Sequence, residues 1–231
     1  LFDLFRNVPL DTQFAHEEGW LPEQATTQQM WDFLVGELND IKGKCGNDNI
    51  MGKINNYAVN MMLAKLYLNH NAYFRGANEL GYDDSDKSWY GKCIDELNEI
   101  IKSGVYSLSN NYLDNFKEDI SSSPEIIFGI PFEMNYAGGN YMASMWMHEA
   151  GRATWEFNNW ATGGAAVLPQ FLDTYEEGDK RLEKTWIMGK RYHHADPNTV
   201  VWEAINYLPS LTCMRDGENN TNINWGYRVG K

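Results

Sequence analysis

Hydrophobic positions recur at three- and four-residue steps in two neighbouring stretches of this chain, residues 56–73 and residues 88–107. This spacing is the period of an amphipathic α-helix. The apolar positions are Tyr57, Ala58, Met61, Met62, Leu66 and Leu68 in the first stretch, and Trp89, Tyr90, Cys93, Ile94, Leu97, Ile100 and Ile101 in the second. The pattern predicts two consecutive helices that each bury one face.

Local signals predict where these helices begin and end. Asn55 is suited to cap the first helix, because its side-chain oxygen can accept a backbone N–H that has no intrahelical partner. Gly104 is suited to the left-handed position that stops the second helix. Ala58 and Ala64 are small enough to let a neighbouring helix come close.

A third helix is predicted upstream of this pair. Thr26 or Thr27 can cap it, and Gly43 and Gly46 mark its end. Its apolar face consists of Met30, Phe33, Leu34, Leu38 and Ile41. Three such helices within about 80 residues cannot each bury a face alone, so they are expected to stack as in helical repeats. A plain three-helix domain would show the same periodicity, and the pattern alone leaves both architectures open.

A loop over residues 71–87 is expected to interrupt the helical part. The pattern changes after Tyr106, where we expect a strand over 125–131, a short helix over 168–177 that begins near Pro169, and short strands over 186–189 and 200–202. The rest is predicted to be loop, which is too much loop for a free-standing compact domain.

We predict a single continuous domain over residues 1–231, because no polar linker or low-complexity segment divides the chain. Within it, residues 1–117 form a helical core and residues 118–231 form a loop-rich part. The fold class is therefore mainly α, with an irregular part that carries short strands.

Charge and composition exclude several function classes. The net charge of −13, with no basic run, argues against a nucleic-acid partner and disfavours anionic membrane surfaces. No segment approaches the roughly 18 apolar residues that a membrane-spanning helix needs. The start at Leu1 without Met indicates a fragment or a mature piece, so a removed targeting segment is compatible with it. Cys45, Cys93 and Cys213 are isolated, and Cys93 is expected to be a buried thiol.

Aromatic residues are unusually frequent, at 14% of the chain with nine Trp and thirteen Tyr. Many lie outside the helical patterns, in residues 141–160 and at Trp186, Tyr192 and Trp202, among asparagines. Flat apolar rings beside amides and carboxylates suit sugars, and they also suit general interfaces. The alternative is that these rings only fix irregular loops onto the helical core.

Catalytic and metal sites are less well supported by the sequence. His148, His193, His194 and Asp196 can be drawn as a metal cluster, but they lack the spacing of a known zinc motif, so solvated loop histidines are expected. The acidic pairs at 17–18, 83–84 and 176–177 can be drawn as glycosidase carboxylates, which lie about 5–10 Å apart across a sugar. Residues 83–86 lack the Gly and Glu of a calcium loop. We therefore predict no cofactor and no metal. Asp179 and Arg181 are expected to order the chain after the short helix.

Five short phrases occur in a fixed order along the chain. They are residues 7–10 (NVPL), residues 58–68 (AVNMMLAKLYL), residues 100–108 (IIKSGVYSL), the set Tyr112, Phe116, Ser123, 125–128 and 130–132, and the set Pro169, 171–175 and 179–181. Their order over residues 7–190 resembles the SusD/RagB family of outer-membrane nutrient-binding lipoproteins. The family's full domain is about twice as long as this chain.

The resemblance implies a tetratricopeptide-like helical core with a loop-rich half that binds ligand. It implies a surface-exposed, lipid-anchored protein of the outer membrane in Bacteroidetes, which captures glycans and passes them to a SusC-like TonB-dependent transporter. The family's aromatic arc has no sequence motif, and only its location can be transferred. That location nominates Trp146, Trp155, Trp160, Trp186 and Trp202, with Arg152, Asn158 and Asn159 as polar partners.

We therefore predict a glycan-binding protein for nutrient uptake that is not an enzyme. Two alternatives from other classes stay open. One is a glycoside hydrolase or an accessory domain of one, and the other is a helical-repeat adaptor that binds proteins.

Overall fold

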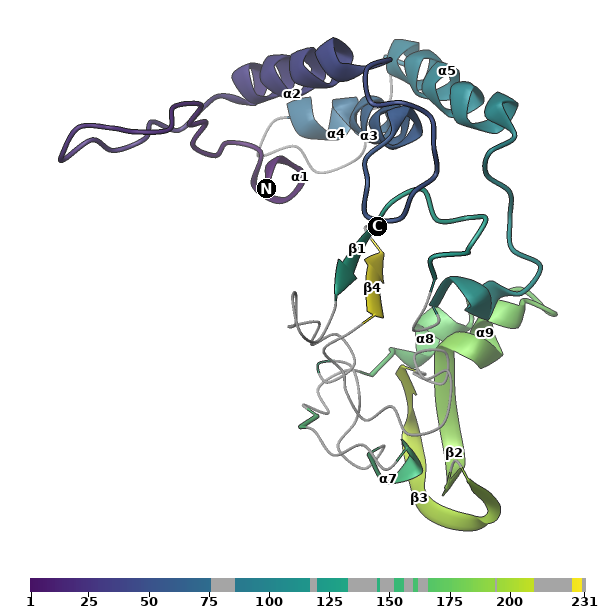
Figure 1. Ribbon diagram of the computed structural model, residues 1–231. Helices are drawn as coiled ribbons and strands as arrows, with labels where there is room; N and C mark the ends of the chain where they lie inside the picture. The colour runs from purple at the N-terminus through teal and green to yellow at the C-terminus, as the bar shows by residue number, and fades with distance from the viewer. Residues whose placement is uncertain are drawn as a thin grey trace. The chain divides into compact units, whose positions relative to one another are not determined.

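The computed structural model describes residues 1–75, 86–116, 120–132, 145, 152–155, 160–161, 166–193, 195–209 and 226–229. The chain forms two compact units (Figure 1). The helical unit comprises Leu1–Asn49 and Lys53–Tyr106, and the second unit comprises Ile50–Gly52 and Ser107–Lys231. The single-domain interpretation with a boundary near residue 117 stays a prediction.

The helical unit is built from α1 (Phe2–Phe5), α2 (Thr27–Ile41), α3 (Asn56–Leu68), α4 (His70–Phe74) and α5 (Ser88–Ser103). In this unit α3 packs against α2, α4 and α5. Its buried apolar side chains form one cluster with contributions from α1, α2, α3, α4 and α5. The predicted stacking of amphipathic helices is therefore confirmed.

The predicted helix ends are also confirmed. The Thr26 side chain accepts a hydrogen bond from the Gln29 backbone N–H, and the Gln29 side-chain oxygen accepts one from the Thr26 backbone N–H, so α2 begins with a capping box. The Asn55 side chain accepts from the Ala58 N–H at 3.0 Å at the start of α3. Gly104 ends α5 with φ of 66°, in the left-handed region where a Cβ would be strained.

The buried face of α3 differs from the prediction. Its buried residues are Ala58, Val59, Asn60, Leu63, Ala64 and Tyr67. Met62 is 51% exposed and Met61 is 39% exposed. Apolar residues lie almost all around this helix, so the three-to-four-residue spacing fitted two different faces. The packing of α2 and α5 decides between them.

A polar side chain lies on the buried face of α3 because it has a charged partner. The Asn60 Nδ2 donates to Glu96 Oε2 of α5 at 2.6 Å, and Lys42 Nζ lies 2.7 Å from both Glu96 oxygens. Glu96 is buried in the helical unit. A buried carboxylate needs this pairing to offset the loss of hydration. The three side chains tie the end of α2 to α3 and α5.

Two other helical predictions need correction. The loop expected from residue 71 begins later, because α4 continues to Phe74, and residues 76–85 of that loop lie outside the described residues. On α5, Cys93 and Ile100 are buried as predicted, but Ile101 is 73% exposed and Ile94 is exposed too. Burial also raises the pKa of the Cys93 thiol. Cys213 lies outside the described residues.

The second unit contains η1 (Tyr112–Phe116), β1 (Gly129–Phe132), α7 (Arg152–Trp155), α8 (Pro169–Leu172), α9 (Lys180–Thr185), β2 (Trp186–His193), β3 (Asp196–Pro209) and β4 (Gly226–Val229). Strands β1 and β4 pair antiparallel, with Gly129 opposite Val229. Strands β2 and β3 form an antiparallel hairpin in which Arg191 lies opposite Trp202.

The strands of the second unit differ from the sequence-based expectation. The strand expected over 125–131 is β1, which starts only at Gly129. The two short strands expected over 186–189 and 200–202 belong to one long hairpin. Strand β2 continues through Gly189. The φ of this glycine is 78°, in the left-handed region, and the strand pairing shifts register beside it, as at a β-bulge. Pro169 occupies the first turn of α8, as predicted.

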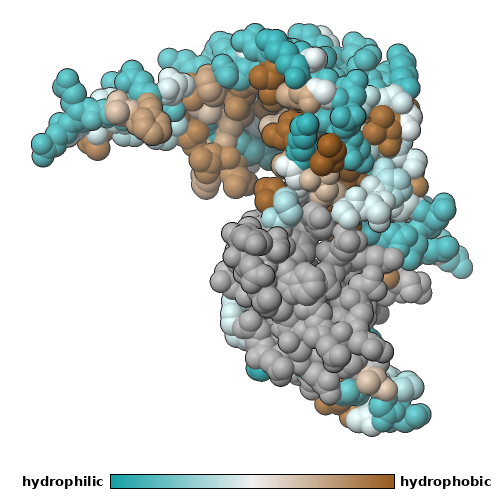
Figure 2. All heavy atoms as spheres, viewed as in Figure 1, coloured by the Kyte–Doolittle hydropathy of each residue, from teal (hydrophilic) through white to brown (hydrophobic). Residues whose placement is uncertain are grey.

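An apolar groove opens on the helical unit, with a volume of about 390 Å³. Its apolar lining includes Leu1, Phe2, Val8, Met30, Leu34 and Met62. Figure 2 shows apolar side chains gathered at the surface of this unit. None of the helices in the described part of the chain has the length and apolar character that a bilayer crossing requires.

Candidate functional site

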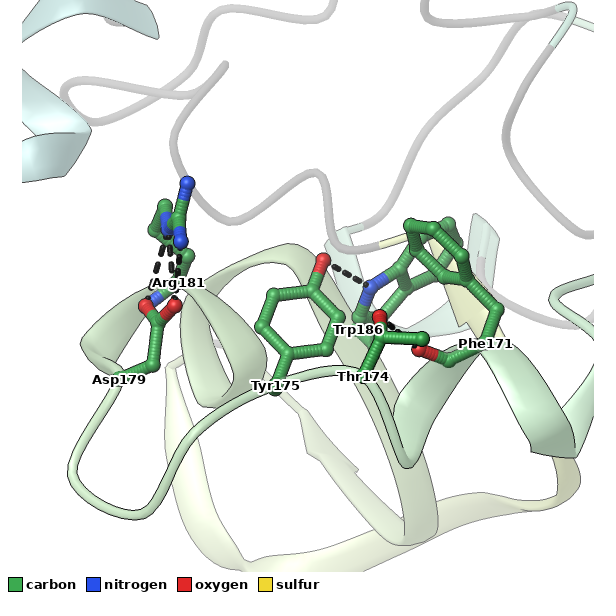
Figure 3. A network of polar contacts seen from close by, with 6 residues as sticks. All are labelled: Phe171, Thr174, Tyr175, Asp179, Arg181 and Trp186. Atoms are coloured by element: carbon green, nitrogen blue, oxygen red, sulfur yellow. Dashed lines mark hydrogen bonds and ion pairs between the residues drawn. The ribbon is translucent and has the colours of Figure 1, made fainter.

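Three aromatic side chains of the second unit meet where α8 approaches β2 (Figure 3). The Phe171 ring lies edge-on to Tyr175, with ring centres 5.7 Å apart, and edge-on to Trp186 at 6.4 Å. Trp186 Nε1 donates to the Tyr175 hydroxyl oxygen at 3.1 Å. Edge-to-face contacts and this hydrogen bond hold the three rings in one arrangement. We call Phe171, Tyr175 and Trp186 the α8 aromatic cluster.

The local sequence places this cluster. Pro169 starts α8, and the Thr174 hydroxyl donates to the Phe171 carbonyl at 2.6 Å where the helix ends. The chain then turns so that Tyr175 follows Phe171 by four residues, a spacing that brings side chains together over one helical turn. Phe171 stays about half exposed. The cluster therefore presents an apolar ring at the surface of the second unit.

An ion pair borders the α8 aromatic cluster (Figure 3). Asp179 caps α9 by accepting from the Arg181 N–H at 2.9 Å, and Arg181 Nε lies 3.0 Å from each Asp179 oxygen. These hydrogen bonds from Arg181 lower the pKa of Asp179. The Arg181 guanidinium lies 6.0 Å from the Tyr175 ring centre. The predicted role of the pair in ordering the chain is confirmed.

A second group of contacts fixes Trp202 on the β2–β3 hairpin. Trp202 Nε1 donates to the Thr154 hydroxyl oxygen at 2.8 Å, and Thr154 is buried. Helix α7, which carries Thr154, packs against both β2 and β3. The hydrogen bond thus holds the Trp202 indole in place through a residue of another element.

The predicted site residues fall into different surroundings. Arg152 and Trp155 lie in α7, which packs against the hairpin that carries Trp202. These three predicted residues therefore belong to neighbouring elements. Trp186 belongs to the α8 aromatic cluster, five residues along β2 from the position opposite Trp202, which is about 16 Å. Trp160 is 45% exposed. Trp146, Asn158 and Asn159 lie outside the described residues.

Two rings of the α8 aromatic cluster, Phe171 and Tyr175, were not among the predicted site residues. Their four-residue spacing after Pro169 is the signal that could have found them. Arg191 was also missed, since its position opposite Trp202 depends on the register of the hairpin. An exposed Tyr192 follows it in β2.

The residues considered for metal binding or catalysis have local roles where they are described. Asp196 accepts from the Asn198 N–H at 2.9 Å and from the Thr199 hydroxyl at 2.6 Å, which lowers its pKa and shapes the hairpin turn. His193 ends β2 and is half-buried, rather than solvated in a loop as predicted. Among the described residues, no group of three or more His, Cys, Asp or Glu side chains could hold a metal ion.

The remaining candidates for catalysis are either exposed or outside the described residues. The acidic pairs at 17–18 and 176–177 are exposed. His148, His194 and the acidic residues at 83–84 lie outside the described residues.

No protein-family model matches the sequence, and the search of curated proteins finds no match. Solved structures do match. A SusD superfamily protein from Parabacteroides distasonis aligns over 97% of this chain and 49% of its own, with a TM-score of 0.74 and 21% identity. A SusD superfamily protein from Bacteroides fragilis aligns over 99% and 49%, with a TM-score of 0.69 and 14% identity.

A third solved structure includes a ligand. Surface glycan-binding protein A from Bacteroides thetaiotaomicron in complex with laminarihexaose aligns over 89% of this chain and 47% of its own, with a TM-score of 0.61 and 19% identity. The chain thus spans about half the length of the structures it matches. The prediction of a mainly helical fold with a tetratricopeptide-like core and a loop-rich part is confirmed. The chain therefore has the SusD-like fold.

Proposed function

We propose that this protein binds oligosaccharides at the bacterial cell surface and does not transform them. The observation that carries the proposal is the SusD-like fold, which it shares with a surface glycan-binding protein solved in complex with laminarihexaose. Fold alone does not determine function, because function depends on the groups at the site. The proposal therefore also requires that the side chains of the second unit are suited to bind a sugar.

The aromatic rings of the second unit supply that support. Trp160 and Phe171 are both about half exposed, and Tyr192 is exposed on β2. Sugar rings present C–H patches that stack on flat apolar faces, while their hydroxyl groups need a few fixed polar partners. The hydrogen bonds at Trp186 and Trp202 hold their rings in place before a ligand arrives, which lowers the entropy cost of binding.

The sites we propose for glycan contact follow from this division. Trp160 is the leading stacking residue, with Trp155 and Arg152 of α7 beside the hairpin and Trp146, Asn158 and Asn159 as further candidates. Trp186 and Trp202 contribute ring surface and also hold α8 and α7 in place. No metal or cofactor is included in the proposal.

The proposed setting is the outer membrane. We infer that the protein is lipid-anchored at the cell surface and passes its ligand to a SusC-like TonB-dependent transporter. A net charge of −13 is unsuited to nucleic acid, which is consistent with an extracellular ligand of another class. Co-purification with a SusC-like outer-membrane transporter from the same bacterium would test this part of the proposal.

Native affinity electrophoresis tests the binding function. The protein is run in gels that contain laminarin, starch or galactomannan, with bovine serum albumin as the non-binding control. Retardation in at least one gel is expected, and the retained polysaccharide is then incubated with the protein and analysed for shorter products. Retardation without products supports a binding protein.

Two results would favour the other classes. Products from the retained polysaccharide would identify a glycoside hydrolase. Migration unchanged in every gel, together with binding of a protein partner that no sugar competes for, would identify a helical-repeat adaptor.

A further inference from the structure

Arg191 carries a buried polar atom for which the described part of the chain offers no acceptor. Its Nε is shielded from solvent and makes no hydrogen bond among the residues that the structure describes. Buried donors in native proteins are almost always paired, so each exception requires an explanation, and a bound ligand is one. The residue as a whole is half-buried, so part of it is exposed to solvent.

The residue directly opposite Arg191 is Trp202. Cross-strand partners in an antiparallel pair project from the same face of the sheet, so the Arg191 and Trp202 side chains lie on one face. Helix α7 contacts this face, because Trp202 Nε1 donates to its Thr154 hydroxyl oxygen at 2.8 Å. The neighbouring pair, Lys190 opposite Glu203, is exposed and lies on the other face.

The pair combines the two kinds of group that recognise a sugar. A fixed indole offers a flat apolar surface, and a guanidinium offers several N–H donors in one plane to hydroxyl oxygens. The charge of the whole chain, −13, opposes a polyanionic ligand. Arg181, the cation beside the α8 aromatic cluster, is already paired with Asp179.

We propose that Arg191 and Trp202 form a subsite for an uncharged sugar residue, in which the Arg191 guanidinium donates hydrogen bonds to the sugar hydroxyl oxygens. The proposal rests on the glycan-binding function proposed above and specifies the class of glycan. It assigns Arg191 to ligand binding rather than to the stability of the hairpin.

Three variants test the role of Arg191. R191M keeps the length of the side chain and removes its donors, R191K keeps the charge and removes the planar fork, and K190M makes the same kind of change on the opposite face. Dissociation constants are measured by isothermal titration calorimetry with laminarin, or with whichever neutral polysaccharide retards the parent protein. R191M is expected to bind about tenfold or more weakly, since hydrogen bonds from charged donors are strong. R191K is expected to lose less, and K190M is expected to bind like the parent.

Thermal unfolding separates binding from structure. Removing a buried donor that has no acceptor is expected to leave the unfolding temperature of R191M unchanged or higher. A lower unfolding temperature with unchanged affinity would show that Arg191 stabilises the hairpin, and it would overturn the assignment. If R191M does not fold, the affinity of R191K decides, and affinity equal to that of the parent overturns the proposal.

The class of glycan is tested in the same gels with two acidic polymers, polygalacturonate and chondroitin sulfate. Retardation by a neutral polysaccharide and not by the acidic ones supports the subsite. Stronger retardation by an acidic polymer would overturn the neutral class and leave the glycan-binding function standing. Retardation by neither class would contradict the glycan-binding function itself, and the subsite with it.

Discussion

Aromatic side chains are packed differently in the two units. In the helical unit, Trp31 is only 5% exposed and contacts a set of rings from other helices. That set consists of Tyr67, His70, Tyr73, Phe74 and Trp89. In the second unit, Trp186 and Trp202 are half-buried and held through indole hydrogen bonds, while Trp160 is 45% exposed.

The difference teaches that composition alone does not identify a binding surface. The same ring contributes to stability when other rings and helices surround it, and it can contribute to recognition when only its edge is held. The high aromatic content of this chain is therefore the sum of two populations. Substitutions at matched tryptophans can separate them.

The largest effect is expected for Trp31→Ala. Removing this buried ring leaves a cavity among several aromatic side chains, so the free energy of unfolding should fall by about 3–5 kcal/mol. Urea denaturation followed by circular dichroism measures the loss. Trp160→Ala is the matched control and should change stability by less than about 0.5 kcal/mol. Equal losses in the two variants would contradict the division into two populations.

Trp160→Ala should instead weaken glycan binding. If this ring stacks on a sugar, the variant loses roughly 1–3 kcal/mol of binding free energy. Calorimetry with the retained polysaccharide measures the change. Trp20→Ala is the control, because Trp20 is similarly exposed, at 44%, but belongs to the helical unit. An unchanged affinity for Trp160→Ala would remove Trp160 from the proposed site and leave the fold unaffected.

Thr154→Val tests the hydrogen bond that positions Trp202. The substitution keeps the shape of a buried side chain and removes the acceptor of the indole N–H, which should cost about 1–2 kcal/mol of stability. Thermal unfolding checks this. Thr12→Val, at an exposed position of the helical unit where the hydroxyl makes no hydrogen bond among the described residues, serves as the control. A Thr154→Val protein with parental stability would mean that the indole finds another acceptor.

The smallest effect is a pH dependence in the helical unit. The Tyr73 hydroxyl donates to Asp3 Oδ1 at 2.7 Å, and this bond, with Lys65 nearby, lowers the pKa of Asp3 below its usual 3.8. A lowered carboxyl pKa contributes stability above pH 3.8 that is lost as the pH falls through the folded-state value. Asp3→Asn should therefore cost under about 1 kcal/mol at pH 7, since the carboxylate is half exposed, and almost nothing at pH 2.

The check is urea denaturation of parent and variant at both pH values. Tyr73→Phe removes the same hydrogen bond from the other side and should show the same loss of pH dependence. A cost for Asp3→Asn that is equal at pH 7 and pH 2 would show that the carboxylate charge does not stabilise the fold.

Much of the helical unit could be predicted from the sequence, because its signals are local. The caps at Thr26 and Asn55 and the stop at Gly104 depend on residues within one helical turn, and all three are confirmed. The order of five short phrases also predicted the SusD-like fold. In the second unit, the hairpin register that places Arg191 opposite Trp202 joins residues eleven positions apart, and no local pattern specifies it.

What the sequence alone determined is where α2 and α3 begin and where α5 ends, and that the chain is acidic and rich in aromatic rings. The tertiary structure decided which side of α3 is buried, since Met62 and Leu63 are both apolar and the neighbouring helices cover only Leu63. It also decided that Trp31 lies in the core while Trp160 lies at the surface. Burial depends on contacts between elements distant in sequence, whereas a helix cap depends on hydrogen bonds between near neighbours.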